Sequence, residues 1–274
     1  MNIGTYKLDP TRPAIMGIIN VTPDSFSDGG SFLETPNAID HALRLIDEGA
    51  DIIDIGGESS RPGSDPVPVD EELGRVTPVI EGIRKRSDIP ISIDTTKSIV
   101  AKRAIDAGAD MINDISAGRF DSEILALAAM GNKPICLMHM KGTPKTMQDD
   151  PTYGDLIGEI RDFLADAISR AVEQGVRRNN IVIDPGIGFG KSADDNIEIL
   201  KRLNDFAALE APILVGASNK SFIGKTLKLD IKERLEATLA TIPTSVEGGA
   251  GILRLHDVKS SRRFLDMYLL CRNT

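Results

Sequence analysis

Residues 181–191 read IVIDPGIGFGK, and this stretch decides how the rest of the chain is interpreted. Three β-favouring residues run into Asp184, and Pro185 with the three glycines after it ends the strand in a tight loop. Parallel α/β folds bind ligands at the carboxyl ends of their strands, so an acid followed by a glycine-rich loop predicts a ligand-binding mouth. An Asp that only caps its own turn fits the same residues, and the other strands must decide.

Seven more short apolar runs recur along the chain, and segments with helical periodicity fill the intervals between them. The predicted strands lie at 14–20, 51–57, 90–96, 111–117, 134–140, 181–188, 211–218 and 251–257. The predicted helices lie at 38–49, 70–86, 98–108, 122–131, 155–175, 193–209 and 231–249, with a last one after Asp257. This alternation predicts an α/β protein, a single (β/α)₈ TIM barrel spanning residues 1–274. A doubly wound open sheet is the alternative.

Two of the predicted connections are unusually long. The first, VTPDSFSDGGSFLETP, follows the strand that ends at Asn20, and the second, ESSRPGSDPVPVD, follows Gly57. Loops of this length on the ligand-binding face of a barrel commonly serve as lids or binding loops. We therefore predict two mobile loops after the first and second strands, with Phe26 and Arg61 as candidate ligand contacts.

The composition excludes several classes of protein. The net charge of −9 argues against a nucleic-acid or anionic-membrane binder, so any anion site must be local. The two cysteines, Cys136 and Cys271, lie far apart without metal-ligand spacing, which predicts reduced thiols rather than disulfides or structural zinc. No signal-like segment or membrane-length apolar run is present, so we expect a soluble cytoplasmic protein.

The predicted strand ends carry two kinds of chemistry. One set offers carboxylate and amide acceptors with a cation, which suits a flat heterocycle with an amino-amide edge: Asp94, Asn113, Asp184 and Lys220, with Met138 and Phe189 as candidate apolar walls. For Met138, ordinary barrel packing competes with this role. The other set suits an anion: Asn20, Arg61, Arg254 and His256. Arg254 and His256 alternate along one strand and so share a face, in the region where barrels commonly bind phosphate.

Eight ordered motifs in this chain resemble those of the dihydropteroate synthase family, and the resemblance covers nearly the whole sequence. The motifs are MGIINVTPDSFSDGG, IIDIGGESSRPG, SIDTTKS, INDISA, LMHMKGTPKTMQ, IVIDPGIGFGK, ASNKSFIG and ILRLHDV. The resemblance implies transfer of a hydroxymethyl-dihydropterin from its pyrophosphate ester to p-aminobenzoate in folate synthesis. It also implies Mg²⁺ and a homodimer.

The resemblance further implies roles for individual residues. Asp94, Asn113, Asp184 and Lys220 would hold the pterin edge, with Met138 and Phe189 near its faces. Asn20, beside the metal, would hold pyrophosphate with Arg254 and His256. The aminobenzoate would lie among Phe26, Ser60, Arg61, Pro62 and Ser221. The residues expected to act in catalysis are Asp94, Asp184, Lys220, Arg254 and His256.

Two departures from the family pattern and two alternatives accompany this assignment. Ser60 stands where the family usually has Thr, which keeps the hydroxyl, and Asn219 stands where it usually has Arg, which removes a cation beside Lys220. A pterin-dependent methyltransferase, working with a corrinoid partner, would share the ring-binding acids but would leave Arg254 and His256 without a purpose. A catalytically silent pterin- or anion-binding homologue would rest on Asn219 alone.

Overall fold

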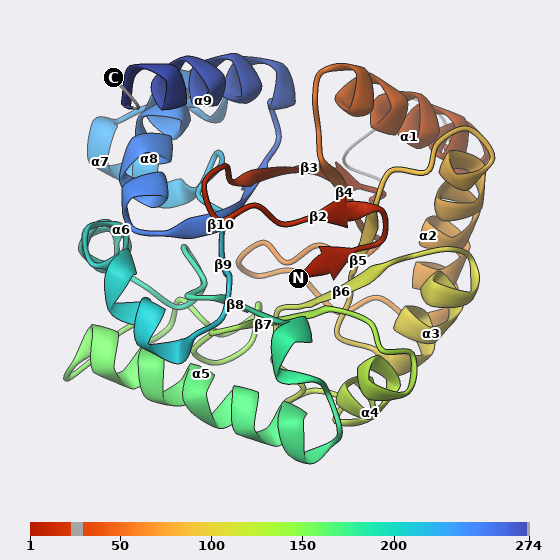
Figure 1. Ribbon diagram of the computed structural model, residues 1–274, viewed down its shortest axis with the longest axis horizontal. Coiled ribbons are helices and arrows are strands. Elements are labelled where there is room, and N and C mark those ends of the chain that lie inside the picture. Colours follow the sequence, from red (N-terminus) through yellow and green to blue (C-terminus); the bar gives the residue numbers. More distant parts are fainter. Residues whose placement is uncertain (23–29, 273–274) are drawn as a thin grey trace.

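The eight predicted apolar runs pair in chain order and close into a parallel barrel in the computed structural model, which describes residues 1–22 and 30–272 (Figure 1). The strands follow one another around the barrel in the order β10-β3-β4-β5-β6-β7-β8-β9, and the helices form a ring outside them. Because β10 pairs with β3 and closes the sheet, the (β/α)₈ prediction is confirmed and the open-sheet alternative is wrong.

The elements have the following bounds. The strands are β1 Asn2–Ile3, β2 Tyr6–Lys7, β3 Ala14–Asn20, β4 Ile52–Gly56, β5 Ile91–Asp94, β6 Met111–Asp114, β7 Ile135–Met138, β8 Ile181–Asp184, β9 Ile213–Val215 and β10 Ala250–Leu255. The helices are α1 Gly30–Asp47, α2 Val69–Arg84, α3 Ser98–Asp106, α4 Glu123–Met130, α5 Leu156–Glu173, α6 Ala193–Lys201, α7 Ser221–Leu227, α8 Leu235–Glu247 and α9 Val258–Arg272.

The register of the strands brings the polar strand ends to one rim. Gly56 pairs with Asn20 on one side and with Asp94 on the other, and Asp94 pairs in turn with Asn113. Across the barrel, Met138 pairs with Asp184. The carboxyl ends of all eight strands therefore surround one mouth, as a parallel barrel requires.

The opposite end of the barrel is closed. The N-terminal hairpin of β1 and β2 lies across the barrel in Figure 1, and Ile3 packs with interior residues of the strands. The interior cluster is apolar, consisting of Ile3, Ala14, Met16, Ile52, Met111, Cys136, Val182, Leu214 and Ile252. Ligands therefore have access from the rim that carries the polar strand ends.

The structure adds two elements that the sequence analysis missed, the N-terminal hairpin and the short helix α7, which precedes α8. The second long loop, residues 57–68, is fully described, whereas residues 23–29 of the first loop, including Phe26, lie outside the described residues, and its end from Gly30 on belongs to α1, which begins earlier than predicted. Among residues 1–22 and 30–272, no helix is both long and apolar enough to cross a membrane.

Candidate active site

The glycine-rich turn after β8 fixes Asp184 at the rim. Gly186 has φ +72°, and a Cβ there would lie 1.9 Å from the carbonyl oxygen of His139. The turn can therefore pass this close to β7 only with glycine. Asp184 Oδ1 accepts a hydrogen bond of 2.7 Å from the Gly186 N–H, so this carboxylate does cap its turn. Capping uses Oδ1, one of the two oxygens of the carboxylate.

An ion-pair network centred on Arg254 connects the carboxylates at the floor of the mouth with its rim. Its Nε donates to Asp54 Oδ2 at 2.6 Å and its Nη2 to Asp94 Oδ2 at 2.7 Å. Asn113 Nδ2 donates to the same Asp54 oxygen at 3.2 Å. The ring-binding set and the anion-binding set predicted from the sequence are therefore connected, because Arg254 of the second set pairs with Asp94 of the first.

Asp54 is a site residue that the sequence analysis missed. It is completely buried, and its Oδ1 has no hydrogen-bond partner within the described residues. A buried acceptor without a partner is unfavourable unless a ligand supplies a donor. The sequence did contain a clue, because Asp54 interrupts the apolar strand IIDIG, and an acid inside a buried strand needs a reason.

Burial in this floor shifts the protonation of its charged groups. Desolvation raises the pKa of Asp184 to about 6, although the Gly186 N–H and Lys220 act in the opposite direction. Desolvation also raises the pKa of Asp94, against the attraction of Arg254. The pKa of Lys220 is lowered to about 8, first by desolvation and then by repulsion from Arg254. A ligand that donates hydrogen bonds to these acids would favour their ionised form.

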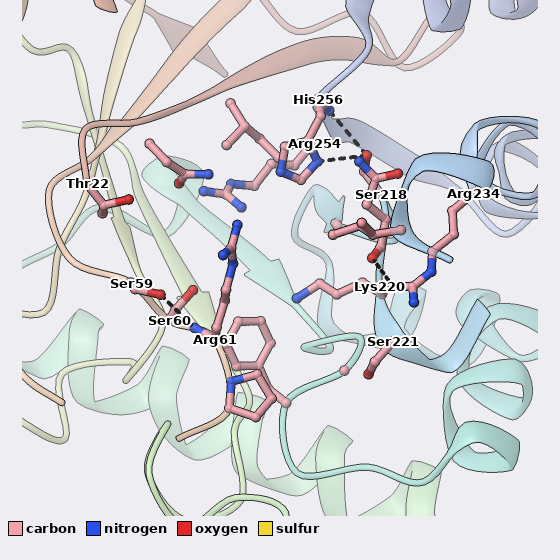
Figure 2. Close-up of a pocket in the computed structure, with 18 of the residues that line it drawn as sticks. Thr22, Ser59, Ser60, Arg61, Ser218, Lys220, Ser221, Arg234, Arg254 and His256 are labelled. Carbon is pink, nitrogen blue, oxygen red and sulfur yellow. Dashed lines mark hydrogen bonds between the residues drawn. The ribbon is translucent and has the colours of Figure 1, made fainter. Parts of the chain in front are cut away.

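Above the floor lies a cavity of about 500 Å³ between the second loop and the segment that leads into α7. Figure 2 shows the cationic ends of Arg61, Lys220 and Arg254 directed into this space from different elements. His256 stands at its edge, with Nδ1 2.9 Å from Ser218 Oγ. Three cations above buried carboxylates create a site that is anionic at the bottom and cationic at the rim.

One wall of the cavity is apolar. The Phe189 ring lies 4.0 Å from Lys220 Nζ, so the cation packs on its face. Phe189 belongs to a small buried cluster with Ile115, Met138, Met140 and Met147. Phe189 lines the cavity, whereas Met138 packs in this cluster and is not among the cavity-lining residues.

The predicted site residues separate into two layers. Those that line the cavity are Asn20, Ser60, Arg61, Pro62, Phe189, Lys220, Ser221, Arg254 and His256. Those that do not line it are Asp94, Asn113, Met138 and Asp184. Asp94 and Asp184 interact electrostatically with Lys220 and Arg254, two of the residues that line the cavity. Phe26 lies outside the described residues.

Arg234, which the sequence analysis also missed, lies beside the unusual Asn219. Its Nη1 donates to the Asn219 carbonyl oxygen at 3.0 Å and its Nη2 to that of Leu229 at 3.2 Å, and the side chain lines the cavity near Ser221 (Figure 2). Asn219 has φ +57°, a conformation that Asn tolerates better than most residues. Nothing in the helical sequence IKERLEATL distinguished Arg234 from a surface residue.

A buried lysine supports the turn that carries Phe189. Lys191 Nζ donates to the Phe189 carbonyl oxygen at 3.0 Å and lies 2.9 Å from His139 Nδ1. Desolvation is the main reason that the pKa of Lys191 is lowered to about 7. The contact accounts for His139 as a supporting residue, because its ring nitrogen faces Lys191 and not the cavity.

Comparison with known proteins gives the class to which this barrel and its mouth belong. The family model described as pterin binding enzyme matches residues 16–256. The chain therefore belongs to the pterin-binding enzyme family. Within that family, its activity is that of a dihydropteroate synthase, a transferase, and the methyltransferase alternative is excluded.

The individual similarities are extensive. The dihydropteroate synthase of Synechocystis is 52% identical over 250 residues, which cover 91% of this chain and 86% of the relative. The Yersinia pestis dihydropteroate synthase, in a sulfonamide drug complex, has a TM-score of 0.94 at 41% identity and covers 100% of this chain and 99% of its own. The Xanthomonas albilineans dihydropteroate synthase, with 4-aminobenzoic acid, has a TM-score of 0.91 at 42% identity, and the match covers 97% of this chain and 95% of its own.

Proposed function

We propose that this mouth condenses 6-hydroxymethyl-7,8-dihydropterin pyrophosphate with p-aminobenzoate in three adjoining subsites, giving 7,8-dihydropteroate and pyrophosphate. The observation that carries the proposal is the order of charge with depth: the buried Asp54 and Asp184 and the partly buried Asp94 lie below Arg61, Lys220 and Arg254. A substrate with a donor-rich ring and an anionic tail fits this order with the ring inward.

The pterin subsite is the floor. Asp94, Asn113 and Asp184 offer acceptors to the amino-amide edge of the ring, and the partnerless Asp54 Oδ1 is a further acceptor at the same depth. Lys220 would donate to a ring acceptor, while Phe189 covers one face and Met138 lies behind it in the same apolar cluster. Because Arg254 now contacts Asp54 and Asp94, its guanidinium must share these carboxylates with the ring or turn outward to the diphosphate.

The pyrophosphate subsite is the rim, formed by Arg61, Arg254, His256 and Asn20. Mg²⁺ typically uses few protein oxygens and completes its shell with water and substrate phosphates. The residues present fit such a metal, because Asn20 offers a neutral oxygen at the edge of the cationic rim. We therefore assign Asn20 as the protein group that would hold Mg²⁺, which would stabilise charge on the departing diphosphate when bound.

The aminobenzoate subsite lies between the second loop and α7. Ser60, Arg61 and Pro62 form one side and Ser221 the other, and Phe26 of the first loop is expected to cover it. Arg234 lies on the Ser221 side and is the cation available for the carboxylate of aminobenzoate. Its position compensates for Asn219, which removes the family's usual cation from the neighbouring residue.

The chemistry follows from these positions. When the bond between the pterin CH₂ and the diphosphate oxygen breaks, positive charge develops on carbon and spreads into the ring, where the floor carboxylates stabilise it. Arg254 and His256 stabilise the departing anion. The aminobenzoate nitrogen forms the new bond to CH₂ and loses a proton to pyrophosphate or water. An arylamine is nucleophilic without deprotonation, so no protein nucleophile or strong base is needed.

A steady-state assay with pterin pyrophosphate, aminobenzoate and Mg²⁺ tests the assignment when it is combined with single variants. We expect Ser221→Ala and Arg234→Ala to raise the KM for aminobenzoate with pterin affinity near that of the wild type, and Asn113→Ala to do the reverse. The wild type is expected to form dihydropteroate. If every variant affects both substrates equally, the three-subsite assignment is wrong.

We further propose that residues 1–274 act as one catalytic domain, as a homodimer in the cytoplasm. Exposed apolar side chains on α7 and α9, among them Leu227, Met267 and Leu270, support a subunit contact on the corner of the ring where α7, α8 and α9 gather (Figure 1). The buried Cys136 forms no disulfide, which is consistent with a reducing compartment. Sedimentation of the purified chain would give its oligomeric state.

A further inference from the structure

The second loop, residues 57–68, carries Ser60, Arg61 and Pro62 to the cavity, and a glutamate ties its two ends together. Glu58 Oε2, at the start of the loop, accepts a 2.7 Å hydrogen bond from the backbone N–H of Val67, near its end. The loop is therefore closed at its base by a side chain whose acceptor serves both the backbone and a further partner.

That partner is Lys97. Its Nζ donates to Glu58 Oε2 at 2.6 Å and to Glu72 Oε2 at 2.5 Å. Lys97 precedes α3 and stands three residues after Asp94, whereas Glu72 belongs to α2. One ammonium group thus connects the strand that supplies a pterin-binding acid, the helix after the loop and the loop itself.

The network is largely shielded from solvent. Glu72 has an exposed fraction of 0%, and its Oε1 has no hydrogen-bond partner within residues 1–22 and 30–272. Burial acts to lower the pKa of Lys97, but the hydrogen bonds that Lys97 donates to Glu58 and Glu72 outweigh it, and the pKa is raised. Lys97 therefore remains charged, and its charge stabilises two neighbouring carboxylates, the fully buried Glu72 and the partly buried Glu58.

The base of the loop also lies against α2 through one hydrogen bond and one close backbone approach, and a further hydrogen bond holds the tip of the loop. Arg75 Nη1 donates to the Gly57 carbonyl oxygen at 2.6 Å. A Cβ on Gly57 would lie 2.8 Å from Val76 Cγ1, so the chain passes the helix too closely for a side chain. At the tip, the Gly63 N–H donates to the Pro144 carbonyl oxygen at 3.0 Å. Lys97 and Glu58 connect these anchors to the residues that face the cavity.

We propose that Lys97, acting through Glu58, is a positioning residue that sets the second loop for aminobenzoate binding; the inference rests on the proposed aminobenzoate subsite. Glu58 and Lys97 belong to the motifs IIDIGGESSRPG and SIDTTKS, and neither residue lines the cavity. Their joint position gives them a role in holding the loop. The ammonium holds Glu58, Glu58 holds both ends of the loop, and the loop presents Ser60 and Pro62.

The decisive variant is Glu58→Ala, because it releases the loop while Lys97 and Glu72 still neutralise each other. Losing a charge-assisted hydrogen bond predicts a KM for aminobenzoate that is raised about tenfold, with kcat and pterin affinity within about twofold of the wild type. Glu58→Gln, which keeps an acceptor for Val67 and Lys97, should recover most of the loss. Lys97→Met should raise the same KM further, and Lys97→Arg should restore part of it.

Lys102→Gln is the matched control, since Lys102 lies on the same helix in an exposed ion pair with Asp106 and should leave both KM values unchanged. Pro62→Ala separates the inference from the subsite on which it rests. If Pro62→Ala raises the KM for aminobenzoate but folded Glu58→Ala does not, the positioning role is overturned and the subsite stands. If neither variant raises it, the subsite assignment fails with the inference. Equal losses for pterin and aminobenzoate in Glu58→Ala would also overturn the positioning role.

Discussion

Removing Arg254 should damage both ends of the active site, because its guanidinium is the shared partner of Asp54 and Asp94 at 2.6 and 2.7 Å. Asp54 is completely buried, so Arg254→Ala leaves a buried carboxylate without its counter-charge. Breaking such a pair from one side is expected to destabilise the fold by about 3–5 kcal/mol. Arg12→Ala is a matched control, because the side chains of Arg12 and Asp266 are each 46% exposed and their ion pair should contribute only about 0–1 kcal/mol to the free energy of unfolding.

The pH dependence of this effect has a definite sign. The pKa of Asp94 is raised in the folded protein, mainly by desolvation, while Arg254 lowers it. A carboxyl group with a raised folded pKa favours the folded state at low pH and loses that contribution as pH rises through the folded pKa. Without Arg254 the pKa of Asp94 rises further, so the destabilisation of Arg254→Ala should be larger at about pH 8 than at about pH 5.5.

Urea unfolding of the wild type, Arg254→Ala and Arg12→Ala at both pH values measures the stability effect, and calorimetry with a phosphate-free pterin and with pyrophosphate measures the two affinities. We expect Arg254→Ala to lose affinity for both ligands, because a protonated Asp94 no longer offers a charged acceptor to the ring. Pterin affinity equal to that of the wild type would refute the shared network. So would a destabilisation no larger than that of Arg12→Ala.

Three further predictions concern single side chains. Asp184→Asn should weaken pterin binding, measured by calorimetry, by about tenfold or more, because the amide presents a hydrogen-bond donor to the donors of the ring. An unchanged affinity would mean that Asp184 only caps the Gly186 turn. Asn219→Arg should leave the KM for aminobenzoate nearly unchanged, because Arg234 already supplies the cation, at a stability penalty of about 1 kcal/mol for Arg at φ +57°; a clearly lowered KM would show that Arg234 does not compensate for Asn219. The pKa of Lys191 is lowered to about 7, so this residue destabilises the fold progressively as pH falls from 10 toward 7. Lys191→Met should therefore flatten the dependence of the free energy of unfolding on pH in this range. Parallel pH profiles for the wild type and the variant would exclude the buried amine as the cause.

Much of the fold was predictable because it depends on local patterns. Continuous apolar runs such as IVID, separated by amphipathic segments, need no knowledge of distant contacts to be recognised as buried strands and helices. The N-terminal hairpin and α7 were missed for the opposite reason. The strands of the hairpin have two residues each, and α7 is a seven-residue helix directly after a loop, so neither is long enough to show a period.

The rim residues were also predictable, since chemistry at strand ends and ordered motifs pointed to Asp94, Asp184, Lys220 and Arg254. Their partners were not. Asp54 is 200 residues from Arg254 in the chain, and only closure of β10 onto β3 brings the two within 2.6 Å. The same holds for Lys97 and Glu58, whose contact depends on how α3 begins beside the second loop.

The sequence by itself thus determined which elements form, in what order, and which side chains stand at their ends, because strand and helix periods and turn residues act over a few neighbouring positions. Only the tertiary structure decided which charges share a partner and which remain for a ligand. Ion pairing and desolvation depend on distances of a few ångströms between residues far apart in the chain, and those distances exist only once the barrel has closed.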